Sequence, residues 1–488
     1  MKSFFVAVCL LAIATCADAQ QQTFNVKSAD EFEELIESSK VAAGDTIVWA
    51  TGIFTDVELN IEGGDGTEDH PIVLRAEAPG SVIVDGESQF KIGAKWWVIQ
   101  GFHFKGSPAG FNNYNTFQFR GNSGAPSQNV RMTDCAFTNL NAEDETSKWV
   151  LLYGQYNSID HCHFSGKNKK GALITVELGY LDADATAGHQ IVSNYFGDVS
   201  FQKGSDNETI RIGSSKDQNK CAGCVVRGNY FVRCDGENEV ISSKSSHNVF
   251  ENNTFRQCNG ALVLRHGHHA RVDGNFFFGD GAENSGGIRV VDSHHTITNN
   301  YLHGLTGLTW NAAFSILGGS QKSGGTTNGY QAVDNISVMH NSIINCKRSF
   351  LLNKKKGSRA PTGTIANNLI SSSSGPLITK DLSIEGLNWM GNLIHGAPVG
   401  VDSDAIKSDP KLRRTDGLLR PDPAGPAANA AVKCDVTVIT DIDGQTRPET
   451  NKDIGADEVS GETGEISSRP LAPKDVGVSF LRGSGPEK

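Results

Sequence analysis

The sequence predicts an all-β protein whose chain winds into a single right-handed parallel β-helix, covered at its N-terminal end by a short helix. Two observations predict this fold. A six-residue pattern recurs ten times, as in Phe250-Glu-Asn-Asn-Thr-Phe, and most copies lie 22 to 27 residues apart, the period of a solenoid of parallel strands. The composition also suits many short strands and turns, with 54 glycines, 15 prolines and 38% hydrophobic residues among 488.

The chain begins with a helical segment and then changes to strands. Ser28 and Glu31 form a capping box, and Phe32, Leu35 and Ile36 follow at helical spacing, so we expect one short helix over the open end of the coil. From residue 46 the pattern becomes that of strands bounded by Gly, Pro and Asp. The strands expected here cover residues 46–50, 72–76, 82–85 and 97–104.

The repeated pattern has one polar position that marks each coil. This position is occupied by Cys135, Cys162, Asn194, Asn229, Asn253, Asn275, Asn300, Asn341, Asn368 and Asn392. Asn here indicates a turn in which the side chain hydrogen-bonds to the backbone and stacks on the coil below. The longest gaps between copies, 162–194, 194–229 and 300–341, predict loops that build a binding face.

The cysteines follow the same repeat. Two occupy the marked position, and three more, Cys234, Cys258 and Cys346, follow it by five residues, so we expect them to stack in the interior without a chemical role. Cys221 and Cys224 form a C-x-x-C pair, but no partner cysteine lies at zinc-site spacing. We expect Cys221 and Cys224 to form a local disulfide or to remain as buried thiols.

Residues 1–19 have the features of a secretory signal peptide. Lys2 precedes an apolar run over residues 4–14, and Ala17-Asp18-Ala19 is a cleavage site of the A-x-A type. Cys16 makes lipoprotein anchoring an alternative, although residues 13–15 form a poor lipobox. We expect a secreted or periplasmic protein with a β-helix domain over residues 20–458 and a flexible tail over residues 459–488.

The net charge limits the partners of the protein. At −11 it argues against nucleic acid, and no later segment reaches the roughly 18 apolar residues of a membrane-spanning helix. An anionic partner would need a local basic groove or a bound cation to overcome the overall charge. We expect a monomer.

One stretch, residues 207–265, is expected to bring acidic and basic side chains to one surface. Glu237 and Glu239 point the same way in an extended segment, because side chains alternate between its faces. Lys244 follows on the same segment. Arg265 comes 21 residues later and is expected to return beside Lys244, one strand spacing (about 4.8 Å) away. With Asn207, these residues would combine two carboxylates, an amide, an amine and a guanidinium.

Each of these residues taken alone is more often a solvated or salt-bridged surface residue, and only their joint spacing favours a site. Two carboxylates and an amide oxygen form an oxygen-only ligand set that suits Ca²⁺. A cation beside an amine supports removal of the C5 proton of a uronic acid, because it stabilises the charge that develops on the neighbouring carboxyl group. Arg265 and the cation favour the neutral form of Lys244, whereas Arg265 keeps its own proton firmly.

Three segments resemble polysaccharide lyase family 6, which includes alginate lyases and chondroitinase B on a right-handed parallel β-helix. They are N-E-T-I-R-I-G from Asn207, G-E-N-E-V-I-S-S-K-S from Gly236, and R-H at Arg265-His266. The resemblance implies Ca²⁺-dependent cleavage of mannuronate-containing alginate by β-elimination, which leaves unsaturated uronate ends.

The resemblance also implies a role for each matching residue. The Ca²⁺ ligands would be Asn207, Glu237 and Glu239. Lys244 would be the Brønsted base and Arg265 the Brønsted acid, while Arg289 and His266 would contact the substrate.

Three alternatives stay open. A dermatan sulfate lyase like chondroitinase B would need extra basic residues on the groove, and Lys322 and residues 354–356 are candidates. A pectate-lyase-like enzyme is less favoured, because no motif of that family is found beyond the shared coil. A non-catalytic β-helix that binds an acidic polysaccharide would bind the polymer without forming an unsaturated product.

Overall fold

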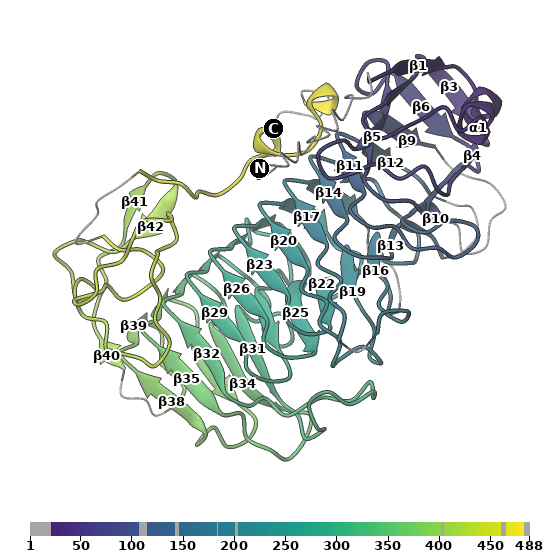
Figure 1. Cartoon of the computed structure of the whole chain (residues 1–488). Coiled ribbons are helices and arrows are strands. Elements are labelled where there is room, and N and C mark those ends of the chain that lie inside the picture. Colours follow the sequence, from purple (N-terminus) through teal and green to yellow (C-terminus); the bar gives the residue numbers. More distant parts are fainter. Residues whose placement is uncertain are drawn as a thin grey trace, which may run out of the picture.

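A computed structural model describes residues 21–482 apart from 107–114, 142–145, 183, 201–203, 402–404 and 460–464 (Figure 1). The signal peptide expected over residues 1–19 lies outside the described residues. Within them, three long parallel sheets of 14, 12 and 14 strands make up nearly the whole fold, and consecutive strands of the chain pass from one sheet to the next. This is a parallel β-helix, as the repeat predicts. The longest helix described has nine residues, so no helix of this part of the chain is long and apolar enough to span a membrane.

Sheets A and B have 14 strands each. In order along the sheet, sheet A contains β1 (Thr23–Val26), β2 (Thr46–Trp49), β5 (Ile72–Ala76), β8 (Trp97–Gln100), β11 (Arg131–Thr133), β14 (Ser158–Asp160), β17 (Gln190–Val192), β20 (Val225–Arg227), β23 (Val249–Glu251), β26 (Arg271–Asp273), β29 (Thr296–Thr298), β32 (Ile336–Met339), β35 (Gly363–Ala366) and β38 (Leu387–Met390). Sheet B contains β3 (Gly52–Thr55), β6 (Val82–Asp85), β9 (Phe102–Lys105), β12 (Ala136–Thr138), β15 (His163–Ser165), β18 (Tyr195–Val199), β21 (Tyr230–Cys234), β24 (Thr254–Arg256), β27 (Phe276–Phe278), β30 (Tyr301–His303), β33 (Ser342–Ile344), β36 (Leu369–Ser372), β39 (Leu393–Gly396) and β40 (Ile406–Lys407).

Sheet C has 12 strands and carries the candidate site. It contains β4 (Glu58–Ile61), β7 (Gln89–Ile92), β10 (Asn115–Gln118), β13 (Lys148–Leu152), β16 (Ile174–Val176), β19 (Ile210–Ile212), β22 (Glu239–Lys244), β25 (Ala261–His266), β28 (Ile288–Val290), β31 (Phe314–Gly318), β34 (Phe350–Lys355) and β37 (Ile378–Lys380). Every strand of sheet C lies parallel to its neighbours, so residues one coil apart in sequence become neighbours in space.

The marked polar position forms a hydrogen-bonded ladder through the interior. The backbone N–H of Asn229 donates to Oδ1 of Asn253 at 3.0 Å, and Nδ2 of Asn229 donates to the carbonyl of Ile191 at 2.8 Å. The same pattern links each coil from Asn194 to Asn392. The predicted stacking of asparagines is confirmed, and the ladder satisfies buried backbone groups that the sheets leave unpaired.

Other parts of the sequence-based description are confirmed or refined. The capped helix is α1 (Ala29–Glu37), whose buried Phe32 stacks on Trp49 with ring centroids 5.8 Å apart. The strand expected over residues 97–104 is interrupted at Gly101, where a φ of +82° turns the chain from β8 into β9. The eight cysteines of the described residues are free thiols, so Cys221 and Cys224 do not form a disulfide here.

The C-terminal segment differs from the flexible tail that we expected. After the antiparallel hairpin of β41 (Arg413–Thr415) and β42 (Leu418–Arg420), residues 465–482 run back along sheet B, with 3₁₀ helices η1 (Pro473–Asp475) and η2 (Ser479–Leu481) (Figure 1). Val476 and Val478 are buried there, and the N–H of Leu471 donates to Oγ1 of Thr254 at 2.8 Å. Burial of these two apolar side chains holds residues 465–482, which we call the strap, against the coil.

One buried cation is expected to make the stability of the coil depend on pH. The ammonium of Lys167 is buried, and its Nζ donates to the carbonyl of Lys169 at 2.7 Å. Burial lowers the pKa of Lys167 to about 7, whereas a lysine in the unfolded chain titrates near 10.4. Between these values the unfolded chain binds the proton and the folded chain does not, so stability should rise with pH by at most about 1.4 kcal/mol per unit.

Urea unfolding of the protein and of Lys167→Met at pH 7 and at about pH 9 would measure this effect. The stability of the unmodified chain should increase between the two pH values by more than that of Lys167→Met. An equal change in both proteins would contradict the assignment to Lys167.

Candidate active site on sheet C

Four neighbouring strands of sheet C, namely β19, β22, β25 and β28, position the candidate residues. The register aligns Arg211, Ser242, Val263 and Arg289 across these strands. Asn207 and Glu208 lie just before β19, and Glu237 lies just before β22. Because these strands start at the same side of the sheet, Asn207, Glu208 and Glu237 lie within a few strand spacings of one another, whereas Lys244 and Arg265 lie at the far ends of β22 and β25.

The acidic residues predicted as metal ligands lie close together at this edge. The N–H of Asn207 donates to Oε1 of Glu237 at 3.1 Å, and Oε1 of Glu239 lies 3.3 Å from Nη1 of Arg289. Burial, and then the charges of Glu208 and Glu239, raise the pKa of Glu237 to about 8. The cluster therefore holds more negative charge than its protein surroundings neutralise.

The donor set fits a hard divalent cation. Asn207 offers an amide oxygen, and Glu237 and Glu239 offer carboxylate oxygens, which are the ligands that Ca²⁺ prefers. Glu208 is buried to 1% exposure, and its Oε2 has no hydrogen-bond partner. A buried carboxylate oxygen without a partner costs free energy, and a cation beside it would remove that cost.

Lys244 lies at the end of β22, next to the acidic cluster. Its Nζ is 3.1 Å from Oε1 of Glu208, and its side chain is 17% exposed. The ammonium is thus fixed by a buried carboxylate on one side while part of the side chain still faces solvent. A substrate on the outer face of sheet C could reach this nitrogen.

The register between β22 and β25 differs from the one that the sequence spacing predicts. Lys244 pairs with His266, whereas Ser243 pairs with Leu264, so Arg265 is an extra residue at a bulge and does not lie opposite Lys244. Arg265 instead reaches the loop before β32, where Nη2 donates to the carbonyl of Asn328 at 2.7 Å. Its guanidinium also lies over the ring of Tyr330, 4.4 Å from the centroid.

His266 is held in one tautomer by two glutamines. Nε2 of Gln218 donates to the carbonyls of Ser215 and Thr327, so Oε1 of Gln218 must accept from Nε2 of Gln331, 3.0 Å away. Oε1 of Gln331 then faces Nδ1 of His266 at 2.8 Å, which places the imidazole proton on Nδ1. Burial lowers the pKa of His266 to about 4, and its Nε2 has no partner within the protein. The neutral ring therefore holds a buried acceptor nitrogen without a protein partner.

Arg289 forms the floor of the site beside the carboxylates. It is 4% exposed, its Nε donates to the carbonyl of Trp310 at 3.0 Å, and its guanidinium lies 5.3 Å from the centroid of that ring. Its Nη2 donates to Oδ1 of Asn311 at 3.1 Å. Arg289 is thus rigidly placed, and its charge is shared with Glu239.

Sequence reasoning missed several residues of the site. Glu208 directly follows Asn207 in the N-E-T motif, so its position was visible, but its contact with Lys244 was not. Trp310, Tyr330 and Gln331 come from the long gap between Asn300 and Asn341, which the repeat marked as a binding-face loop without indicating which side chains would reach the site. The loop expected from this gap therefore contributes side chains to the candidate site.

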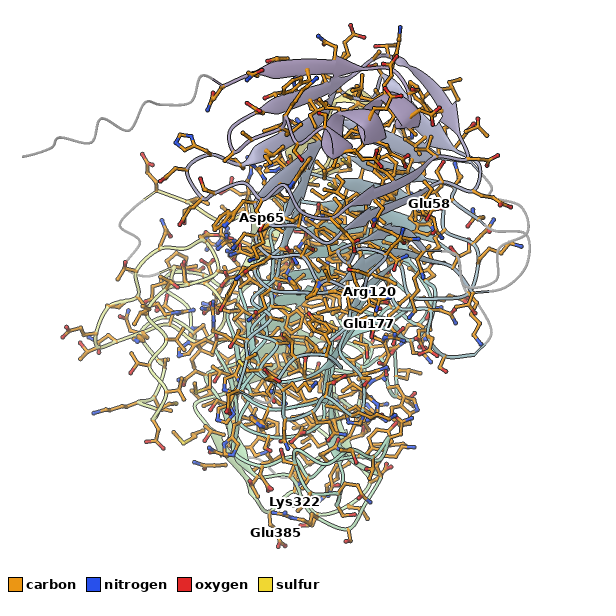
Figure 2. The ribbon with its side chains drawn as sticks, turned by 45° about the vertical axis from the view of Figure 1, so that its right-hand side comes forward. Glu58, Asp65, Arg120, Glu177, Lys322 and Glu385 are labelled. Atoms are coloured by element: carbon orange, nitrogen blue, oxygen red, sulfur yellow. The ribbon has the colours of Figure 1, made fainter. Side chains whose placement is uncertain are left out.

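The surface of sheet C continues toward its N-terminal coils. A cavity of about 280 Å³ is lined by Arg120, Tyr153, Glu177 and Tyr180, among other residues, and the Arg120 guanidinium lies 4.0 Å from the Tyr153 ring centroid. Figure 2 shows Arg120 and Glu177 beside one another, between the N-terminal coils and Lys322. Cationic and aromatic groups therefore extend along the same sheet beyond the acidic cluster.

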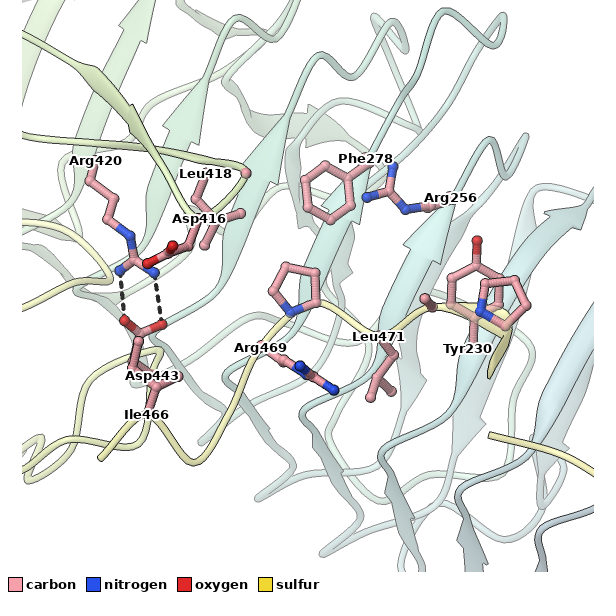
Figure 3. A pocket seen from close by; sticks show the side chains of 14 residues that line it. Tyr230, Arg256, Phe278, Asp416, Leu418, Arg420, Asp443, Ile466, Arg469 and Leu471 are labelled. Atoms are coloured by element: carbon pink, nitrogen blue, oxygen red, sulfur yellow. Dashed lines mark hydrogen bonds and ion pairs between the residues drawn. The ribbon is translucent and has the colours of Figure 1, made fainter. Parts of the chain in front are cut away.

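A larger cavity, of about 740 Å³, lies elsewhere, between sheet B and the C-terminal segment (Figure 3). Three arginines line it, but each is paired with an acid: Arg256 with Asp280, Arg420 with Asp443 and Arg469 with Asp475. None of the predicted site residues lines this cavity. Its charges are balanced within the protein, unlike those at the edge of sheet C.

Comparisons with known proteins identify a family and agree with the fold. Residues 26–416 match the family described as Chondroitinase B. Among solved structures, the PL6 family alginate lyase AlyGC is 30% identical with a TM-score of 0.82, covering 95% of this chain and 60% of that one. A mannuronic acid specific polysaccharide family 6 lyase from human gut microbiota is 27% identical with a TM-score of 0.68, covering 77% of this chain and 87% of that one.

A third structure supports the fold alone. The PL6 family polysaccharide lyase Pedsa3628 from Pseudopedobacter saltans is 22% identical with a TM-score of 0.69, covering 93% of this chain and 99% of that one. The chain spans about 60% of the length of AlyGC. No curated protein matches the sequence.

Proposed function

The chain belongs to the chondroitinase B family, polysaccharide lyase family 6, and from this membership we propose that it is an alginate lyase that cleaves mannuronate-containing linkages with the help of Ca²⁺. One observation carries the proposal. The carboxylates of Glu208, Glu237 and Glu239 adjoin the amine of Lys244 and the guanidinium of Arg289 on the outer face of one sheet. Lys244, Arg289 and a bound Ca²⁺ would attract the acidic polymer locally, despite the overall negative charge of the protein.

The residues support β-elimination in named roles. Lys244 takes the C5 proton of the uronate, the electron pair forms the C4–C5 double bond, and the C4–O4 bond breaks as O4 receives a proton, directly or through water, from Arg265. Bound Ca²⁺, held by Asn207, Glu237 and Glu239, would neutralise the uronate carboxyl group and so make the C5 proton more acidic. Arg289 stays charged beside that carboxyl group. His266 is 1% exposed, so its proposed contact with a sugar requires this ring to become accessible when the substrate binds.

Lys244 must lose its own proton before it can act. Its Nζ lies 3.1 Å from Oε1 of the buried Glu208. Glu208 therefore acts as a positioning residue that holds Nζ at the edge of the site.

Ultraviolet absorbance of the C4–C5 unsaturated product tests the proposal. Polymannuronate, polyguluronate and mixed-block alginate would be incubated separately with the protein in excess Ca²⁺. Absorbance should rise with polymannuronate and mixed blocks. Binding of the polymers without any rise would favour a non-catalytic acidic-glycan-binding β-helix and contradict the proposal.

Dermatan sulfate is the second candidate substrate, because the matching family is described by chondroitinase B. The extra charge of a sulfate would need cations near the groove. Lys356 lies 4.3 Å from the Trp310 ring centroid and 5.2 Å from that of Tyr330, so a cation borders the site there. A rise in absorbance with dermatan sulfate and none with alginate would select this alternative. Export of the protein, which residues 1–19 predict, is compatible with either polymer as the substrate.

A further inference from the structure

Four histidines gather at the turns between sheet C and sheet A, behind the catalytic edge. His247 follows β22, His268 and His269 follow β25, and His294 follows β28. His247, His269 and His294 have φ values of 63°, 58° and 59°, so they occupy the same left-handed turn position on three consecutive coils. The coils thus align the three imidazoles in a row.

The imidazole rings are in contact. His247 stacks on His269 with centroids 5.1 Å apart, and His269 stacks on His294 at 4.7 Å. His268 meets His269 edge-on at 4.8 Å, and their Nδ1 atoms lie 2.7 Å apart. Two ring nitrogens at this distance must share one proton, unless a cation replaces it.

The left-handed turn explains only part of this cluster. Asn and His tolerate a positive φ, and Asn129 and Asn335 fill the same turn position on other coils. His268 has no such backbone requirement, yet its ring points into the row. A structural role for the turn therefore accounts for three of the histidines and leaves the fourth unexplained.

We propose that His247, His268 and His269 bind a divalent transition-metal ion of the class that prefers imidazole, such as Zn²⁺, Ni²⁺ or Cu²⁺. Ligand atoms of the three residues lie within 4.8 Å of one another. A tetrahedral ion with bonds of about 2.0–2.1 Å needs ligand atoms about 3.3 Å apart. His247 and His269 are exposed, so a rotation of their rings that closes this difference would not disturb the buried core.

This site differs in chemistry from the acidic cluster of sheet C. Its ligands are neutral nitrogens, which favour borderline metals, whereas Asn207, Glu237 and Glu239 offer only oxygens, which favour Ca²⁺. His247 lies three residues after Lys244, and His268 lies two residues after His266. The ion would therefore connect the turn after β22 to the turn after β25. Its binding would therefore cross-link the two coils that carry the catalytic edge.

Calorimetry with Zn²⁺ alone tests the site, with the full chain produced without a polyhistidine tag and held in excess Ca²⁺. One Zn²⁺ per chain is expected. The double variant His247→Asn/His269→Asn should lower the affinity for Zn²⁺ about 100-fold. Replacing residues that merely orient the ligands of a metal can already cost that much affinity. Asn is compatible with the left-handed turn, so the variant keeps the backbone, and its far-ultraviolet circular dichroism should match the unmodified chain.

Two controls make the test specific. His70→Asn changes an exposed histidine outside the cluster and should leave Zn²⁺ binding unchanged. The electron paramagnetic resonance spectrum of bound Cu²⁺ should show coupling to nitrogen, which the double variant loses. Absence of Zn²⁺ binding, or binding that survives the double variant, would overturn the proposal, and neither result bears on lyase activity.

Discussion

Replacement of Lys244 by alanine is expected to lower kcat by about 10²- to 10⁴-fold, the contribution of a positioned general base. Within the described residues, Lys244 is the amine that hydrogen-bonds to Glu208, and the imidazole next to it in the sheet is that of His266. His266 is 1% exposed and its Nδ1 faces Oε1 of Gln331, so it is a poor substitute for the lost amine. The rate of formation of unsaturated product on polymannuronate measures the loss.

Loss of the Lys244 amine also leaves the buried Glu208 without a partner, so a second variant is needed. Lys244→Gln keeps a donor for Glu208 but cannot accept the C5 proton, and its activity should fall as far as that of Lys244→Ala. Lys91→Ala serves as a matched control, because Lys91 pairs with Glu58 on the same sheet, far from the site. Retention of most of the activity by Lys244→Gln would exclude Lys244 as the base.

Glu237→Gln is expected to weaken Ca²⁺ binding by about 10- to 100-fold, because the number of charged ligands sets the affinity of such sites. The substitution keeps the shape of the side chain and its hydrogen bond from Asn207, but removes one negative charge from the cluster. Product formation by the variant should therefore require far more Ca²⁺ than product formation by the unmodified chain. Calorimetric titration with Ca²⁺ after chelation measures the affinity directly.

Control measurements distinguish the loss of a Ca²⁺ ligand from a general effect of removing a negative charge. Glu58→Gln removes a carboxylate from the same sheet and should leave Ca²⁺ binding unchanged. Chelation of the unmodified chain should abolish product formation, and Ca²⁺ should restore it. Full activity in the presence of chelator would contradict the proposed role of Asn207, Glu237 and Glu239.

The fold and the centre of the site could be predicted because both depend on a repeat. Each coil returns the chain to the same place, so the spacing of Asn229 and Asn253 carries three-dimensional information. Short early strands such as β3 and β4 were missed, since four residues with partly polar character give little periodic signal.

The remaining features depend on local irregularity or on distant contacts. The bulge at Arg265 changes the register by one residue, and no feature of L-V-L-R-H marks it. Gln331 reaches His266 from 65 residues away, through a loop whose path no period describes. Val476 and Val478 lie outside the repeat, so their burial depends on the surface of sheet B, which local sequence does not reveal.

The strap changes how the molecule should respond to heat or force. In a linear array, each coil contacts only its neighbours, and terminal coils can detach one at a time. Here the N–H of Gly477 donates to the carbonyl of Ser193 at 3.0 Å, and the Phe480 ring lies 5.9 Å from that of His103, while Leu471 contacts Thr254. The strap thus bridges the coils from β9 to β24. Separation of any two coils between these strands must therefore also break the contacts between the strap and the coil. Melting of this half of the molecule should accordingly be a single concerted event. Residues 412–456 pack on the coils from β27 to β39 and should restrain those coils in the same way.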